Sequence, residues 1–189
     1  MKGVKIGVIA EEQNDIDVLY ELTCKLTLES NFSFSKFIGH GCGKLRKKCR
    51  AWSQVLIRIG CSHLVVIHDL DNNDEDCLRQ ELEDSVHGIT FTGHIILIPV
   101  YEIEAWLLSD PLALKQTFSM NKLPNISKHP ETIRNPKEYL RDIVWKYCKK
   151  YYLNTIHNKR IAAAIRIDSL SACRSFSPYP EFLNRNVNN

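Results

Sequence analysis

Four short apolar runs, separated by amphipathic stretches, form the pattern of residues 1–110. Residues 5–10, 64–68 and 94–100 are almost continuously apolar, which is typical of strands buried on both faces. Residues 32–38 alternate between apolar and polar side chains, as a half-exposed strand near the edge of a sheet does. Helical periodicity follows each run, over residues 16–26, 44–59, 74–86 and 101–110. This order predicts an α/β fold with a mainly parallel, four-stranded sheet flanked by helices.

The pattern changes at Pro111, which we expect to end the helix before it. Residues 119–136 contain three prolines and are predicted to form a loop. Helices are expected at 137–152 and 160–165, followed by a terminal segment at 176–183. We therefore predict an α/β domain at 1–115 and a helical extension at 116–189 that packs on it.

Three tryptophans and one histidine fall on apolar stretches. Trp52, Trp106 and Trp145 are expected in the core, and stacking on an unpaired base is the alternative. His68 should point to the opposite face of its strand from Asp69, because neighbouring strand residues alternate. We therefore predict that His68 is a buried histidine of the core, and a role as a ligand is the alternative.

The hydrophobic pattern and the cysteines argue against a membrane-spanning protein and against a structural zinc site. No stretch reaches the roughly 20 apolar residues that a membrane-spanning helix needs, and Met1 leads into a strand pattern instead of a signal peptide. The seven cysteines form no Cys-x-x-Cys pair, so we expect reduced thiols and a cytoplasmic protein without a structural zinc site.

The net charge of +3 conceals an asymmetry between the two parts of the chain. Residues 1–110 contain 11 Lys and Arg against 17 Asp and Glu, a balance of −6. Residues 111–189 contain 14 against 5, a balance of +9. An acidic part followed by a basic part suits a metal-binding core beside a surface that binds a polyanion, and a plain solvated helical surface is the alternative.

The acidic residues gather where the predicted strands end. Asp69 and Asp71 follow a buried strand and, on an extended chain, point the same way. Two close anions favour a divalent metal with oxygen ligands, although acids at this place also cap a following helix. Glu11 and Glu102 follow two other strands, and the carboxyl ends of parallel strands share one edge of a sheet. The acids that this grouping brings to one candidate metal site are Glu11, Asp15, Asp69, Asp71, Glu102 and Glu104, and Asp15 is also expected to cap the first helix.

A basic cluster opens the helix predicted after residue 43. Cations there oppose the helix dipole, which indicates a role other than helix stability. The spacing excludes a Walker A loop, since Ile38 and Leu45 stand where that motif needs Gly and Ser or Thr. The candidate phosphate contacts are Lys44, Arg46, Lys47, Lys48 and Arg50, and a solvated basic face is the alternative.

Three segments carry the strand-end acids: Ile9-Ala-Glu-Glu-Gln-Asn-Asp15, Val66-Ile-His-Asp-Leu-Asp71 and Pro99-Val-Tyr-Glu-Ile-Glu-Ala-Trp-Leu-Leu-Ser-Asp-Pro111. A strand ending in Glu and a later strand ending in Asp-x-Asp resemble the Toprim fold, a Rossmann-like sheet. The third segment is similar to the Glu-x-Glu-Ala-Leu-Leu-x-Ser-Asp segment of its small OLD-nuclease-like members. The tail resembles them at Asn135-Pro-Lys137, Tyr147-Cys-Lys149, Ile161-Ala162 and Cys173…Phe176…Phe182-Leu183. In its Pro-Lys pair, Lys137 is either a further phosphate contact or a surface residue that starts a helix.

The resemblance implies a metal-dependent nuclease acting on DNA or RNA with one or two Mg²⁺ or Mn²⁺ ions. Glu11 would be a general base or metal ligand, and Asp69 and Asp71 metal ligands. Asp15, Glu102 and Glu104 would bind a second metal or support the residues that bind the first. It also implies an anti-phage setting, an ABC-type ATPase partner and a homodimer. This sequence departs from the family at Glu12, where the family has Gly, so either Glu11 or Glu12 could be the ligand. We choose Glu11 because it keeps the family's spacing to Asp15. A non-catalytic subunit that binds nucleic acid or a partner is the alternative function.

Overall fold

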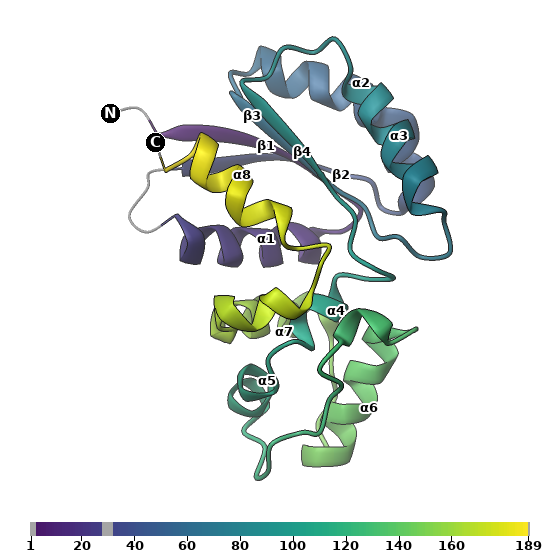
Figure 1. Ribbon diagram of the computed structural model, residues 1–189, viewed down its shortest axis with the longest axis vertical. Helices are drawn as coiled ribbons and strands as arrows, with labels where there is room; N and C mark the ends of the chain where they lie inside the picture. Colours follow the sequence, from purple (N-terminus) through teal and green to yellow (C-terminus); the bar gives the residue numbers. More distant parts are fainter. Residues whose placement is uncertain (1–2, 28–31, 189) are drawn as a thin grey trace.

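Four parallel strands form a single sheet in the computed structural model, which describes residues 3–27 and 32–188 (Figure 1). The strand order is β2-β1-β3-β4, and each neighbouring pair is parallel. The central strand β3 is buried along its whole length, whereas β2 at the edge alternates between half-buried and exposed side chains. The predicted α/β class and parallel sheet are confirmed. The strands are β1 (Val4–Ala10), β2 (Phe32–Ile38), β3 (His63–Ile67) and β4 (Gly93–Leu97).

Helices cover both faces of the sheet. α2 (Cys42–Arg58) and α3 (Glu75–Val86) lie on one face, and α1 (Gln13–Leu26) and α8 (Pro178–Asn186) lie on the other (Figure 1). The side chains of β3 alternate between the two cores, because successive strand residues point to opposite faces. Gly7 lets α2 approach β1 closely, since a Cβ at this position would lie 2.9 Å from Cδ1 of Leu56.

The remaining helices form a lobe below the sheet in Figure 1. One hydrophobic cluster runs from the sheet through the fully buried Trp106 to the helices of the lobe, and the expected boundary at 115/116 falls inside α5. α8 returns from the lobe to pack beside β4. The elements of the lobe are α4 (Glu104–Leu107), α5 (Pro111–Phe118), η1 (Pro130–Thr132), α6 (Pro136–Cys148), α7 (Asn154–Ala164) and η2 (Ile167–Ala172).

Several helix boundaries differ from the sequence prediction. The helix expected at 160–165 begins six residues earlier, at Asn154, and the helix expected over 101–110 is only the short α4. Pro111 does not end a helix but begins α5, where its missing N–H is no loss and Asp110 caps the free N–H groups of Leu112 and Ala113. α6 ends at Cys148, because Lys149 adopts the left-handed conformation with φ of 55°. The prediction that this helix extends to Tyr152 is therefore wrong.

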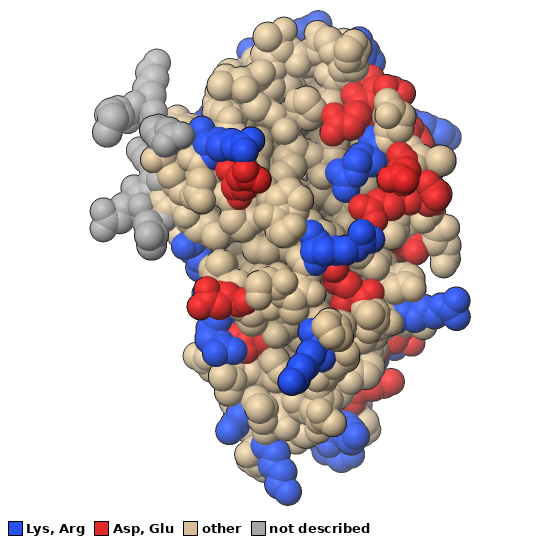
Figure 2. Space-filling model, in the orientation of Figure 1, with Lys and Arg blue, Asp and Glu red and all other residues tan. Residues whose placement is uncertain are grey.

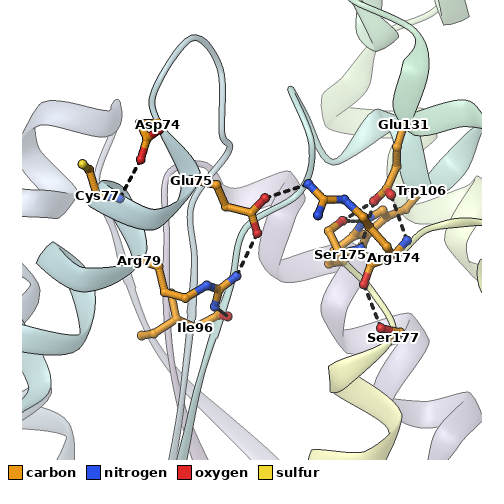
Figure 3. Close-up of polar contacts among 10 residues, drawn as sticks. All are labelled: Asp74, Glu75, Cys77, Arg79, Ile96, Trp106, Glu131, Arg174, Ser175 and Ser177. Atoms are coloured by element: carbon orange, nitrogen blue, oxygen red, sulfur yellow. Dashed lines mark hydrogen bonds and ion pairs between the residues drawn. The ribbon is translucent and has the colours of Figure 1, made fainter.

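Polar contacts fasten the segment before α8 to α3, α4 and η1 (Figure 3). Glu131 of η1 accepts hydrogen bonds from the backbone N–H groups of Arg174 and Ser175, at 2.8 and 3.1 Å. The Arg174 guanidinium pairs with Glu75, and the indole N–H of Trp106 donates to Ser175 Oγ at 2.7 Å. These contacts join the C-terminal segment to α3 beside the sheet and to the lobe.

The tryptophans do not share one environment. Trp106 is fully buried, and Trp52 is half-buried and stacked on Phe37 with ring centroids 5.3 Å apart. Trp145 is 46% exposed, so the prediction that it belongs to the core is wrong. Within the described residues, no helix is long and apolar enough to cross a membrane.

Candidate metal centre

An acidic cavity of about 170 Å³ lies at the carboxyl edge of the sheet, where the lobe meets it. Loops after β1, β3 and β4 contribute carboxylates to its wall, because parallel strands deliver their carboxyl ends to one edge. Lys137, in the first turn of α6, contributes a cation from the lobe. The lining residues are Glu11, Glu12, Asn14, Asp15, Asp69, Asp71, Glu102, Glu104 and Lys137, which include all six predicted metal ligands.

His68 holds Glu11 in place. Glu11 Oε1 lies 3.0 Å from His68 Nδ1 and accepts a hydrogen bond from the backbone N–H of Asp69 at 3.2 Å. His68 Nδ1 also lies 2.7 Å from the Asp69 carbonyl oxygen, so this nitrogen faces two acceptors and must carry the proton. His68 is fully buried, as predicted, but its role is to orient a carboxylate of the cavity.

Asp69 and Asp71 lie beyond the end of β3. Asp69 Oδ1 accepts a hydrogen bond from the backbone N–H of Ile103 at 3.0 Å, which ties the β3 loop to the β4 loop. Asp71 has a φ of 48°, so the extended geometry assumed for the pair does not persist to this residue. Tyr101 in the facing loop has a φ of 63°, and its carbonyl oxygen accepts from the Asp71 N–H at 3.0 Å. Left-handed backbone at a bulky residue is rare and clusters at functional sites.

Glu102 connects the cavity to the beginning of α6. Its Oε2 accepts a hydrogen bond from the backbone N–H of Lys137 at 2.9 Å, within the first helical turn. The first N–H groups of a helix lack partners within it and carry its positive dipole end. Glu102 therefore orients α6 with its N-terminus toward the cavity.

A buried network holds Glu104. Its Oε1 accepts hydrogen bonds from Tyr152 Oη and Asn158 Nδ2, both at 3.1 Å, and Tyr152 also bonds to Asn158. All three residues are buried, with Glu104 2% exposed. The carboxylate of Glu104, the first residue of α4, is thus fixed by two residues that lie later in the lobe.

Asp15 occupies the third position of α1. The N-cap is Glu12, so the prediction that Asp15 caps the helix is wrong. Asp15 Oδ2 instead accepts from the Glu12 backbone N–H at 2.8 Å, the reciprocal half of a capping box. This contact turns the Asp15 side chain back toward the cavity, whose wall it forms.

Four carboxyl groups of the cavity, those of Asp15, Asp69, Asp71 and Glu104, have raised pKa values. Burial raises the pKa of Asp15 to about 7, with further increases from Glu104, Glu12 and Glu11. Burial also raises the pKa of Asp69 and of Glu104, and partial burial together with Glu11 raises that of Asp71. Burial alone would lower the pKa of His68, but its contact with Glu11 outweighs this and the pKa is raised. The negative charge of the cavity is therefore incompletely balanced by the protein.

The donor set suits a hard divalent cation, because its wall offers several carboxylate oxygens. As the side chains are placed, residues 3–27 and 32–188 contain no group of three or more His, Cys, Asp or Glu that could hold a metal ion. A bound cation would therefore require some of these carboxylates to rotate toward it.

The basic residues of α2 lie outside the lining of the cavity. Arg46 forms a bidentate ion pair with Glu81 of α3, and the Arg50 guanidinium donates to the His87 carbonyl oxygen at 3.1 Å. Both are thus engaged within the protein. The side chains of Lys44, Lys47 and Lys48 are exposed in the first half of the helix.

The sequence analysis missed Asn14, Tyr152 and Asn158 as parts of the site, and it treated His68 first as a core histidine and only second as a ligand. The position of His68 directly before Asp69 was the available signal. Tyr152 and Asn158 reach Glu104 across 48 and 54 residues of chain. Such contacts depend on how the lobe packs, which periodicity does not report.

Fold and cavity together define an α/β protein with an acidic site at the carboxyl edge of a parallel sheet. The chain belongs to the family described as domain of unknown function DUF4276, whose model matches residues 21–184. The match includes Asp69, Asp71, Glu102 and Glu104 and begins after Glu11 and Asp15. No curated protein and no solved structure matches the chain significantly.

Proposed function

We propose that this protein is a metal-dependent nuclease that hydrolyses phosphodiester bonds of DNA or RNA. The observation that carries the proposal is the acidic cavity, where seven carboxylates and one lysine line about 170 Å³ at the carboxyl edge of the sheet. Uncompensated carboxylates at this place favour Mg²⁺ or Mn²⁺, and the resemblance of the strand-end motifs to the Toprim fold supports the same chemistry.

One or two bound ions would activate water and neutralise charge on the phosphate. Glu11, Asp69 and Asp71 would hold them, with Asp15, Glu102 and Glu104 as further ligands. Within the chain, His68 orients Glu11 and leaves its second oxygen for the proton of the attacking water. Lys137 in the cavity wall would contact a substrate phosphate.

The setting of the reaction follows from the same resemblance. We place the protein in the cytoplasm as an effector of anti-phage defence that acts with an ABC-type ATPase and dimerises on its substrate. The exposed Lys44, Lys47 and Lys48 of α2 would contact the nucleic acid backbone, with weaker contributions from Arg46 and Arg50, which already have partners within the protein.

A non-catalytic subunit that binds nucleic acid or a partner is the second candidate. It is favoured by one observation: no group of three or more potential ligands within residues 3–27 and 32–188 is already arranged to hold a metal. Such a subunit would keep the fold and the basic surface, and would bind nucleic acid without cutting it.

Cleavage by the purified protein separates the two. Supercoiled plasmid, single-stranded DNA and total tRNA are incubated with Mg²⁺, Mn²⁺ or EDTA. Asp69→Asn removes a charge but keeps the oxygen that accepts from Ile103, and Asp84→Asn changes an exposed acid of α3 as the matched control. We expect metal-dependent cutting that Asp69→Asn abolishes and Asp84→Asn retains. Equal cutting by Asp69→Asn would refute the proposal, and binding without cutting would support the second candidate.

A further inference from the structure

Two exposed aromatic rings and a lysine form a cluster at the C-terminal end of α6. Trp145 is 46% and Tyr151 77% exposed, and their ring centroids lie 5.5 Å apart. Lys149 Nζ lies 5.4 Å from the centroid of the Trp145 ring. We call Trp145, Lys149 and Tyr151 the aromatic cluster. Nothing in the site described above uses it.

The backbone at the cluster is strained. Lys149 is the left-handed residue that ends α6, with φ of 55°, a position that glycine usually fills. A side chain in this conformation costs about 1 kcal/mol or more. Strain of this kind is concentrated at functional positions, and here it keeps a cation beside the Trp145 ring.

The charge around the cluster is strongly positive. Residues 137–160 contain seven Lys and Arg against two Asp and Glu. In Figure 2, blue side chains gather around the lower end of the molecule, where Figure 1 places the lobe. Exposed aromatic rings among cations fit a polyanion that also offers flat, apolar faces, which describes nucleic acid bases on their backbone.

α6 connects the cluster to the acidic cavity. Its first turn lies at the cavity, through Lys137 and the contact of its backbone N–H with Glu102. Lys137, Arg141, Trp145 and Lys149 follow at intervals of four residues, the spacing of one helical face. At about 1.5 Å per residue, Trp145 lies about 12 Å along the axis from Lys137. That length corresponds to roughly three or four stacked nucleotides.

We propose that the aromatic cluster binds an unpaired strand of the substrate, with bases stacked on Trp145 and Tyr151 and the backbone following α6 toward the cavity. This inference rests on the proposed nuclease function and specifies its substrate as single-stranded nucleic acid, or a duplex with an unpaired segment. A fully paired duplex would not bind in this way, because its bases are already stacked on one another and present no free faces.

Binding is measured without metal, so that it does not depend on cleavage. Fluorescence anisotropy of labelled 12-nucleotide DNA and RNA, single-stranded and as duplexes, is recorded in EDTA. Trp145→Ala and Tyr151→Ala should each weaken single-strand binding roughly five- to 150-fold. Tyr20→Ala, which alters a tyrosine of α1 that is 43% exposed, is the matched control and should leave binding unchanged.

Lys149→Gly separates binding from folding. Glycine adopts the left-handed conformation without cost, so the melting temperature should stay the same or rise. Single-strand binding should nevertheless weaken, and the slope of log affinity against log salt should fall by about 0.7, the value for one phosphate contact on a single strand.

Some results would overturn the inference. Equal affinity for single strand and duplex, no effect of the three variants, or no binding of any oligonucleotide would each do so. Self-association that is lost in Trp145→Ala, without oligonucleotide binding, would assign the surface to a protein contact instead. Asp69→Asn tests the proposed function separately. If the wild type and Asp69→Asn both bind a single strand but the wild type does not cleave it, the nuclease is refuted, and the aromatic cluster remains a single-strand binding surface without a substrate role.

Discussion

The chemistry of the cavity depends on which oxygen of each carboxylate is already engaged. Glu11 uses Oε1 for His68 and the Asp69 N–H, Asp69 uses Oδ1 for Ile103, and Glu104 uses Oε1 for the lobe. Each contact fixes a carboxylate at one oxygen, and the second oxygen stays available to a ligand in the cavity. Anchoring through one oxygen is how surrounding hydrogen bonds orient metal-binding carboxylates.

His68 is expected to act through Glu11. His68→Leu removes the Nδ1 proton that holds Glu11 Oε1, and the cleavage rate should fall roughly 10- to 100-fold. His68→Asn retains a donor near the Nδ1 position and should recover most of that loss. Rates and circular dichroism are measured for both variants. Equal rates for Leu, Asn and the wild type would show that His68 does not position Glu11.

Asp15 makes the metal-free protein less stable as pH rises. Its pKa in the folded state is raised from 3.8 to about 7, so the folded protein retains a proton that the unfolded chain loses between those values. The free energy of unfolding should therefore fall from about pH 4 to pH 7, and the contribution is absent below pH 4.

Asp15→Asn removes this effect while its amide oxygen keeps the contact with the Glu12 N–H. In EDTA at pH 7.5, the variant should be more stable than the wild type by an amount on the order of a few kcal/mol, and at pH 4 the two should be equal. Urea unfolding at both pH values measures the difference. A wild type whose stability is constant across this range would contradict the prediction.

At the scale of elements, α6 and α5 show how the lobe is attached. α6 presents its first turn to Glu102, and α5 begins at Asp110, whose side chain caps two N–H groups and binds Arg166 at 2.9 Å. Burial by itself raises the pKa of Asp110, but the hydrogen bonds from Arg166 outweigh it, so the pKa is lowered. Asp110 thus joins the beginning of one helix to the end of another.

Asp110 is expected to contribute both a helix cap and an ion pair. Asp110→Asn keeps an oxygen for the cap and should cost about 1 kcal/mol, which allows for the solvent exposure of Arg166. Asp110→Ala removes both and should cost roughly 2–4 kcal/mol. Asp168→Ala, at an exposed acid, is the control and should change stability by less than about 0.5 kcal/mol. Equal stability of the Ala variant and the control would contradict the assignment.

For the whole molecule, the sequence was informative where periodicity and chain direction decide the structure. The parallel sheet followed from the alternation of strands and helices, and the strand-end acids were expected together because parallel strands end at one edge. Pro111 and Lys149 were misjudged, because helix ends depend on tertiary caps and on tolerated strain. Trp145 was predicted to be in the core because it belongs to an apolar helical stripe. Such a stripe does not show which of its side chains are covered by another element, and Trp145 is exposed.

The central claim is that the acidic cavity binds divalent cations, and Mn²⁺ binding by electron paramagnetic resonance tests it most directly. Free Mn²⁺ is titrated with wild-type protein, with Asp69→Asn and with the control Asp84→Asn at pH 7.5. We expect one or two ions bound by the wild type and the control, and at least tenfold weaker binding by Asp69→Asn. Binding by Asp69→Asn equal to that of the wild type, or no binding by any of the three, would contradict the claim.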